Sequence, residues 1–90
     1  MDQQTRRLLI QGKLLDGTLP YDSIRRVWGG SGHWELCDGC DEIIEQVQLL
    51  MEGINAKGQG IQFHVECFYI WDHERRVGGD GGAPLERIVS

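Results

Sequence analysis

Apolar positions in the first part of the chain predict one short helix. Between residues 2 and 16, leucine and isoleucine mix with glutamine, arginine and lysine, and Asp16-Gly17 followed by Pro20 is a stop signal. Gly12 lowers helix propensity inside this segment, so the helix needs a surface to lie on. We expect it to pack on the rest of the domain; the alternative is a detachable helix that binds a partner.

Residues 17–36 show no sustained period of 2 or 3.6, and we expect an irregular, flexible approach to the segment that follows. Gly29-Gly30-Ser31-Gly32 interrupts the scattered apolar residues. This glycine run lacks the Gly-Lys-Ser/Thr ending of a P-loop, so it does not indicate a nucleotide site. Arg25 and Arg26 lie near two tryptophans and are interpreted as solvated, with a small binding patch as the alternative.

The pattern becomes strand-like after residue 42. Ile43 and Ile44 precede an apolar run at 47–51, a glycine-containing turn occupies 55–60, and a second apolar run follows at 61–63. Two strands around such a turn predict a β-hairpin. The hairpin would bring the end of the second apolar run, at residues 61–63, back beside the segment that precedes the first strand.

A closing helix is predicted for residues 64–77. Val65, Phe68 and Tyr69 fall on one helical face, Trp71 widens that apolar face, and Gly78-Gly79 ends the segment. Residues 78–90 then have the composition of a flexible tail.

All three cysteines belong to one pattern of candidate metal ligands. Two residues separate Cys37 from Cys40, two separate His64 from Cys67, and 23 lie between the pairs. Three thiolates and one imidazole are a complete ligand set for tetrahedral zinc. The spacing therefore predicts one structural Zn²⁺ held by Cys37, Cys40, His64 and Cys67.

Local sequence explains how each pair of ligands reaches the same ion. Asp38 and Gly39 suit a tight turn, and we expect Gly39 to adopt the positive φ that lets backbone amides fold over a thiolate. Residues three apart lie on one helix face, so the histidine and cysteine of the second pair suit a helix's first turn. His33 and His73 are interpreted as solvated, with a role as extra or exchanged ligands as the alternative.

The length of 90 residues indicates one small domain, residues 1–90. A single hydrophobic core of this size gives only marginal stability unless a disulfide or a bound metal adds to it. Three cysteines cannot all pair within one chain, and no apolar signal segment precedes them, which favours the reducing cytoplasm. No apolar run approaches the roughly 20 residues that span a bilayer, so we expect no membrane partner. A bound metal, rather than a disulfide, is therefore the expected stabilising cross-link.

Charge is spread unevenly along the chain. Nine acidic residues against Lys57 alone give residues 31–74 a net charge of −8, whereas residues 1–30 carry +2. Phosphate contacts need clustered basic groups, so this distribution disfavours nucleic acid as the partner. Another protein is the expected partner.

Together these elements predict a small α+β zinc-stabilised domain. Residues 37–77 would form a treble-clef-like finger, made of a knuckle, a β-hairpin and a C-terminal helix, with an added N-terminal helix. The Cys-x2-Cys knuckle and the His-x2-Cys-Phe ending resemble the first zinc module of LIM domains, although Tyr69-Ile70-Trp71 follows where a second LIM module needs a cysteine.

Two further resemblances cover other parts of the chain. Residues 40–51 with the same ending resemble the zinc finger of poly(ADP-ribose) polymerases and DNA ligases, a family that senses DNA breaks. That resemblance implies the fold and the ligand set. The helix, Arg26-Val27-Trp28-Gly29-Gly30, the knuckle and Phe63-His64 with Cys67 and Trp71 resemble a group of small uncharacterised bacterial proteins, which implies no known activity.

Four protein ligands leave no open coordination position, which favours a structural zinc and a protein that is not an enzyme. We expect a protein-interaction module. Two alternatives stay open. One is a nucleic-acid-binding or transcription-regulating finger that uses its arginines; the other is a thiol-based redox or metal sensor, in which oxidation of Cys37 and Cys40 expels zinc.

Overall fold

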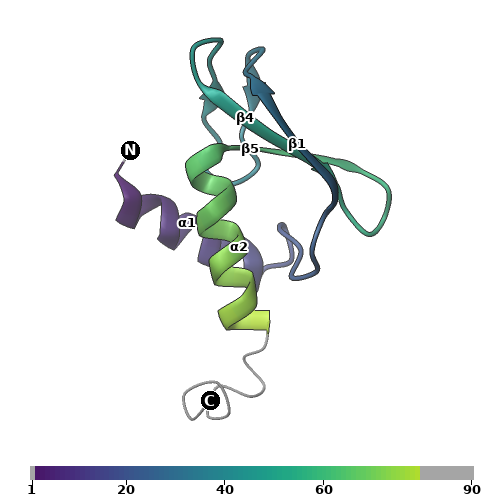
Figure 1. Cartoon of the computed structure of the whole chain (residues 1–90). Helices are drawn as coiled ribbons and strands as arrows, with labels where there is room; N and C mark the ends of the chain where they lie inside the picture. The colour runs from purple at the N-terminus through teal and green to yellow at the C-terminus, as the bar shows by residue number, and fades with distance from the viewer. Residues whose placement is uncertain (1, 80–90) are drawn as a thin grey trace.

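Seven elements follow one another along residues 2–79, the part of the chain that the computed structural model describes (Figure 1). They are helix α1 (Gln3–Leu15), strands β1 (Arg25–Ser31), β2 (Glu35–Leu36), β3 (Ile43–Ile44), β4 (Leu49–Ile54) and β5 (Gly60–His64), and helix α2 (Val65–Gly79). Neither helix in this range is long and apolar enough to cross a membrane. The α+β class predicted from the sequence is confirmed.

The strands form two antiparallel sheets. The larger has the order β1-β4-β5, and β2 pairs with β3 in a small two-stranded sheet. The β4-β5 hairpin closes where Asn55 N donates to Gln59 O at 2.9 Å, and Gly58 takes a φ of 81° in the turn. This hairpin confirms the sequence prediction.

The prediction of an irregular segment at residues 17–36 is wrong, because β1 and β2 both lie inside it. β1 is the edge strand of its sheet, and Val27 and Trp28 are 42% and 46% exposed. A strand that buries so little has no need of alternating apolar and polar residues. Gly29-Gly30 therefore belongs to a strand that the hydrophobic pattern does not mark.

The core lies between the main sheet and the two helices. Phe63 of β5 stacks on Trp71 of α2 with ring centroids 5.2 Å apart, and both side chains are almost fully buried. The Trp71 indole Nε1 donates to the Pro20 carbonyl oxygen at 2.9 Å, which holds the segment after α1 against α2. Ile10 and Leu19 complete this region.

The buried face of α2 matches the predicted one only in part, because Trp71 is buried and Phe68 packs against the core, but Tyr69 does not. Cys67, Ile70 and Trp71 are buried, whereas Tyr69 is 62% exposed. The apolar residues of α2 lie all around its circumference, so their spacing alone does not predict which face is buried. Gly78 and Gly79, predicted to begin the tail, are the last residues of α2, and the rest of the predicted tail lies outside the described residues.

Helix α1 begins and ends close to the predicted bounds. The Asp2 carboxylate caps it by accepting a hydrogen bond from Thr5 N at 2.7 Å, and this bond lowers the pKa of Asp2. Ile10 and Leu14 are buried, so they form the face that α1 turns toward the rest of the protein.

Polar contacts also join the two helices. Arg6 forms an ion pair with Glu66 at 2.7 Å, and Gln11 Nε2 donates to Glu74 Oε1 at 2.9 Å. The expectation that the N-terminal helix packs on the rest of the domain is thereby confirmed.

Candidate metal centre

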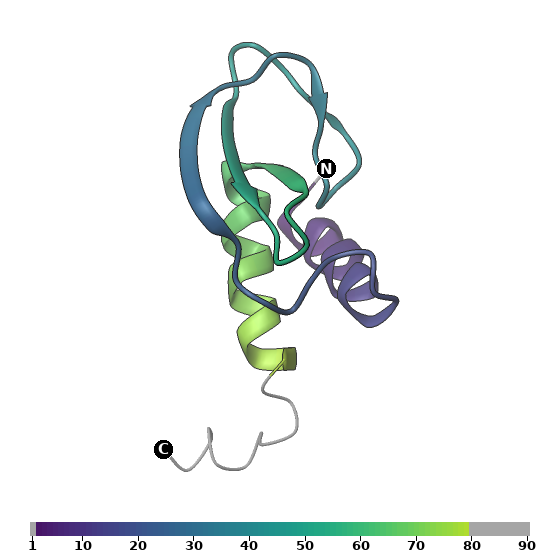
Figure 2. The same ribbon diagram turned by 90° about the vertical axis from the view of Figure 1, so that its right-hand side faces the viewer.

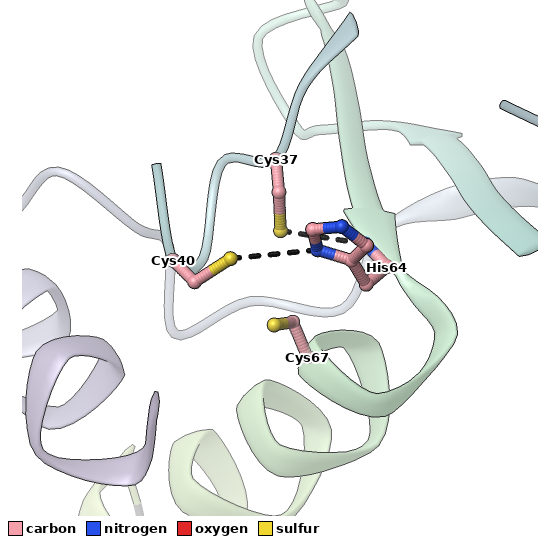
Figure 3. A group of neighbouring side chains, drawn as sticks. All are labelled: Cys37, Cys40, His64 and Cys67. Atoms are coloured by element: carbon pink, nitrogen blue, oxygen red, sulfur yellow. Dashed lines mark hydrogen bonds between the residues drawn. The ribbon is translucent and has the colours of Figure 1, made fainter. Parts of the chain in front are cut away.

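The fold brings together all four predicted ligands. The Sγ atoms of Cys37, Cys40 and Cys67 and a ring nitrogen of His64 lie within 4.8 Å of one another, and all four residues are buried. Cys37 and Cys40 come from the loop between β2 and β3, His64 ends β5, and Cys67 lies in the first turn of α2 (Figure 3). The arrangement is compatible with a structural zinc site.

The loop at residues 37–40 is a tight knuckle. Asp41 N donates to Cys37 O at 2.9 Å, and Cys37 N donates to Glu42 O at 2.8 Å. The chain reverses at Asp41, which takes a φ of 66°. The two cysteines of the knuckle therefore face the same point.

The predicted role of Gly39 is wrong in its mechanism, because Gly39 is not among the residues with positive φ. Its backbone instead lies in a crowded place. A Cβ at Gly39 would lie 3.1 Å from Cys67 Cβ, 3.2 Å from Phe63 Cδ1 and 3.3 Å from Ile10 Cδ1. A side chain at this position would crowd atoms of β5, α1 and α2, which all pack against the knuckle.

Two further contacts fix the knuckle in place. Asp38 N donates to Gln62 O at 2.8 Å, and Gln62 N donates to Asp38 Oδ2 at 2.8 Å, so the knuckle is joined to β5. Lys13 Nζ reaches from α1 to donate to Asp38 O at 2.9 Å and to Asp41 Oδ1 at 2.6 Å. Lys13 supports the site although its position in the sequence gives no signal of this role.

The surroundings of Cys37 favour its thiolate. Gly39 N and His64 N donate to Cys37 Sγ at 3.4 and 3.3 Å. Hydrogen bonds from the side chains of Cys40 and Cys67, and from the backbone amides of Cys40 and His64, lower the pKa of Cys37. A sulfur atom whose thiolate form is favoured by its hydrogen bonds is a suitable ligand for a cation.

The environment of Cys67 has the opposite effect. Its hydrogen bonds to Cys37 and Cys40, together with burial, raise the pKa of Cys67. Three neighbouring sulfurs cannot all ionise in a buried place unless a positive charge lies among them. A divalent cation supplies that charge, so the donor set fits zinc.

His64 is oriented by its hydrogen bonds. Its Nε2 lies 3.2 Å from Ile43 O and 3.1 Å from Gln48 Oε1. Gln48 Oε1 also accepts from Glu45 N at 2.7 Å, which fixes this atom as the amide oxygen. Both neighbours of Nε2 are acceptors, so Nε2 carries the hydrogen.

The other ring nitrogen, Nδ1, therefore presents a lone pair, and it faces Cys40 Sγ at 3.4 Å. A histidine that donates its second N–H to a carbonyl group is the usual arrangement beside a bound metal. Gln48 is thus a supporting residue that the sequence pattern did not reveal.

The two other histidines lie apart from this cluster within the described residues. The His33 ring lies 3.1 Å from Ser31 O, and His73 of α2 lies 4.0 Å from Glu74. Both are exposed. The alternative in which they serve as extra ligands receives no support.

Comparisons with known proteins return nothing. No protein-family model, curated protein or solved structure matches the chain. The site must therefore be interpreted from its own geometry and chemistry.

Proposed function

We propose that the chain is a zinc-binding protein with one structural Cys3His site, and that it serves as a protein-interaction module. The observation that supports zinc is the cluster of four buried donors within 4.8 Å of one another. In a tetrahedral site with Zn–S bonds of about 2.3 Å, sulfur atoms lie roughly 3.8 Å apart. The ligands would be Cys37, Cys40, His64 and Cys67.

The proposed role of this ion is structural. Four protein donors complete a tetrahedral shell, whereas a catalytic zinc keeps one position for water or substrate. A knuckle, a hairpin and a helix whose first turn holds the last ligand support a treble-clef-like organisation. We infer that the protein is not an enzyme.

The interaction role rests on the character of the surface. Tyr69, Trp34 and Val47 are 62%, 60% and 89% exposed, and residues 31–74 carry the large acidic surplus. Contiguous exposed apolar groups rimmed by charge are typical of surfaces that bind other proteins, and we propose that these side chains contribute to such a surface. We propose a cytoplasmic setting, because buried thiols remain available to zinc under reducing conditions.

The nucleic-acid alternative has less support from the positions of the basic side chains. Arg6 is paired with Glu66, and both Arg75 and Arg76 are paired with Asp72. Cations held by carboxylates of their own chain are less available to phosphates. The redox alternative predicts loss of zinc after mild oxidant and recovery with reductant, and that measurement distinguishes it from a permanent structural site.

Native mass spectrometry with and without a chelator tests the zinc proposal. We expect one zinc per chain, and a broad charge distribution typical of an unfolded protein after removal, because binding of structural zinc contributes roughly 10–16 kcal/mol in small fingers. Cys40→Ser should lose the ion and the fold together. His33→Ala, which removes an exposed imidazole, is the matched control and should keep both. A folded protein that holds no metal would contradict the proposal.

A further inference from the structure

The outer edge of β1 is open. Figure 2 shows β1 on the outside of the main sheet, with β4 on its inner side. The opposite edge of this sheet is partly covered, since Asp38 N donates to Gln62 O and Gln62 Nε2 donates to Leu36 O at 3.2 Å. β1 and β5 are the two edge strands of this sheet, and β5 is partly covered by residues 36–38, so the outer edge of β1 is the more open one.

The ladder with β4 determines which backbone groups point outward. Gly32 N donates to Gln48 O at 2.9 Å, and Gly30 lies opposite Leu50 in the same register. In an antiparallel pair, alternate residues bond to the neighbour and the others point away. The N–H and C=O groups of Gly29 and the N–H group of Ser31 therefore face outward, whereas the Ser31 carbonyl oxygen lies 3.1 Å from the His33 ring.

This edge has little protection against pairing. Edge strands are usually guarded by charges, proline or bulges. An irregular register between Arg25 and Trp28 guards the beginning of β1, but residues 27–31 contain neither charge nor proline. Val27 and Trp28, both about half exposed, flank the open backbone.

The two glycines of this strand have no role inside the chain. A Cβ at Gly30 would meet nothing within 4 Å, a Cβ at Gly29 would make only ordinary contacts at 3.6 Å, and neither residue has positive φ. Each glycine nevertheless destabilises a strand by roughly 0.5–1 kcal/mol relative to alanine. Glycines, which have no side chain, are often found in a strand where another backbone approaches closely.

Charge along β1 favours a second copy of the same chain as the occupant. Arg25 lies at the start of the strand. At its far end, a Cβ at Gly32 would meet the backbone carbonyl oxygen of Glu45, so that acidic residue lies beside the end of the strand. When two such strands run antiparallel, the basic start of each meets the acidic end of the other.

We propose that β1 pairs antiparallel with β1 of a second copy, with Gly29 near the two-fold axis. The two three-stranded sheets then join into one sheet of six strands. An isologous contact of this kind uses the same edge of both copies and closes as a dimer. The proposal specifies the partner of the proposed interaction module, and it rests on that function because the zinc-loaded fold positions the sheet.

Amide hydrogen exchange on the zinc-loaded protein gives the first test. Between about 10 μM and 1 mM, we expect exchange at Gly29 and Ser31 to slow at least tenfold, whereas Gly30, already bonded to β4, stays unchanged. Sedimentation over the same range should show monomer turning into dimer. A zinc-loaded chain that stays monomeric at about 1 mM would overturn the pairing and leave the zinc proposal intact.

Charge reversal gives a second test on the same zinc-loaded samples. Arg25→Glu and Glu45→Arg should each weaken dimerisation about tenfold, because each change acts twice in a symmetric dimer. The double variant should recover most of the affinity. Lys57→Glu, an equal change of charge in the exposed β4-β5 turn, is the control and should have little effect. Single variants that dimerise like the parent would refute this arrangement.

Discussion

The packing around the knuckle predicts the effect of adding one methyl group at Gly39. In Gly39→Ala, the new Cβ would lie 3.1 Å from Cys67 Cβ and 3.2 Å from Phe63 Cδ1, whereas carbon atoms pack best at about 3.5–4.0 Å. Ile10 closes the third side at 3.3 Å. Relief requires these neighbouring atoms to move by a few tenths of an ångström in a well-packed region, and overpacking of this kind costs roughly 1–3 kcal/mol.

Urea denaturation of the zinc-loaded protein measures this free energy of unfolding. If the proposed zinc site is right, the same substitution should weaken zinc binding in a competition titration with a chromophoric chelator, because its nearest neighbour belongs to the proposed ligand Cys67. Both effects have one cause, so they should appear together.

Gly12→Ala is the matched control, since the same methyl group there meets nothing within 4 Å in the interior of α1. It should stabilise the protein by roughly 1 kcal/mol, because alanine is the better helix former. If Gly39→Ala proved as stable as the parent, the knuckle would have room that the structure does not show, and the reasoning would fail.

Three further predictions concern the helices. Ile10→Ala should lower the free energy of unfolding in urea by about 2–5 kcal/mol, because the Ile10 side chain is fully buried where α1 packs against the knuckle. Trp71→Phe should lower it by about 1–3 kcal/mol, since the Pro20 carbonyl loses its donor. The pKa of Asp2 is lower in the folded state than in the unfolded one, so its stabilisation is present above the unfolded pKa and is lost as the pH falls through the folded pKa. Asp2→Asn should remove this part of the acid dependence in a pH series of denaturation curves.

The grouping of the four candidate ligands could be predicted from sequence because its information is local. Cys37-x2-Cys40 and His64-x2-Cys67 each place two donors within reach of one ion, and the hairpin signals between them explain how the pairs meet. Burial of all four residues in one cluster agrees with that prediction.

β1 could not be predicted because it is defined by its neighbour. Its hydrogen bonds go to β4, and its side chains are largely exposed, so no periodic pattern is required. The prediction of a positive φ at Gly39 is wrong for a related reason. This position is crowded by side chains from three distant segments, and such crowding leaves no mark in the local sequence.

The junction between β5 and α2 has a mechanical consequence. β5 ends at His64 and α2 begins at Val65, so strand and helix follow each other without a loop. His64 and Cys67 lie on either side of this joint and face the same point. An ion bound there would tie the end of the sheet to the first turn of the helix, so the joint would be held by coordination as well as by the packing of α2 on β5.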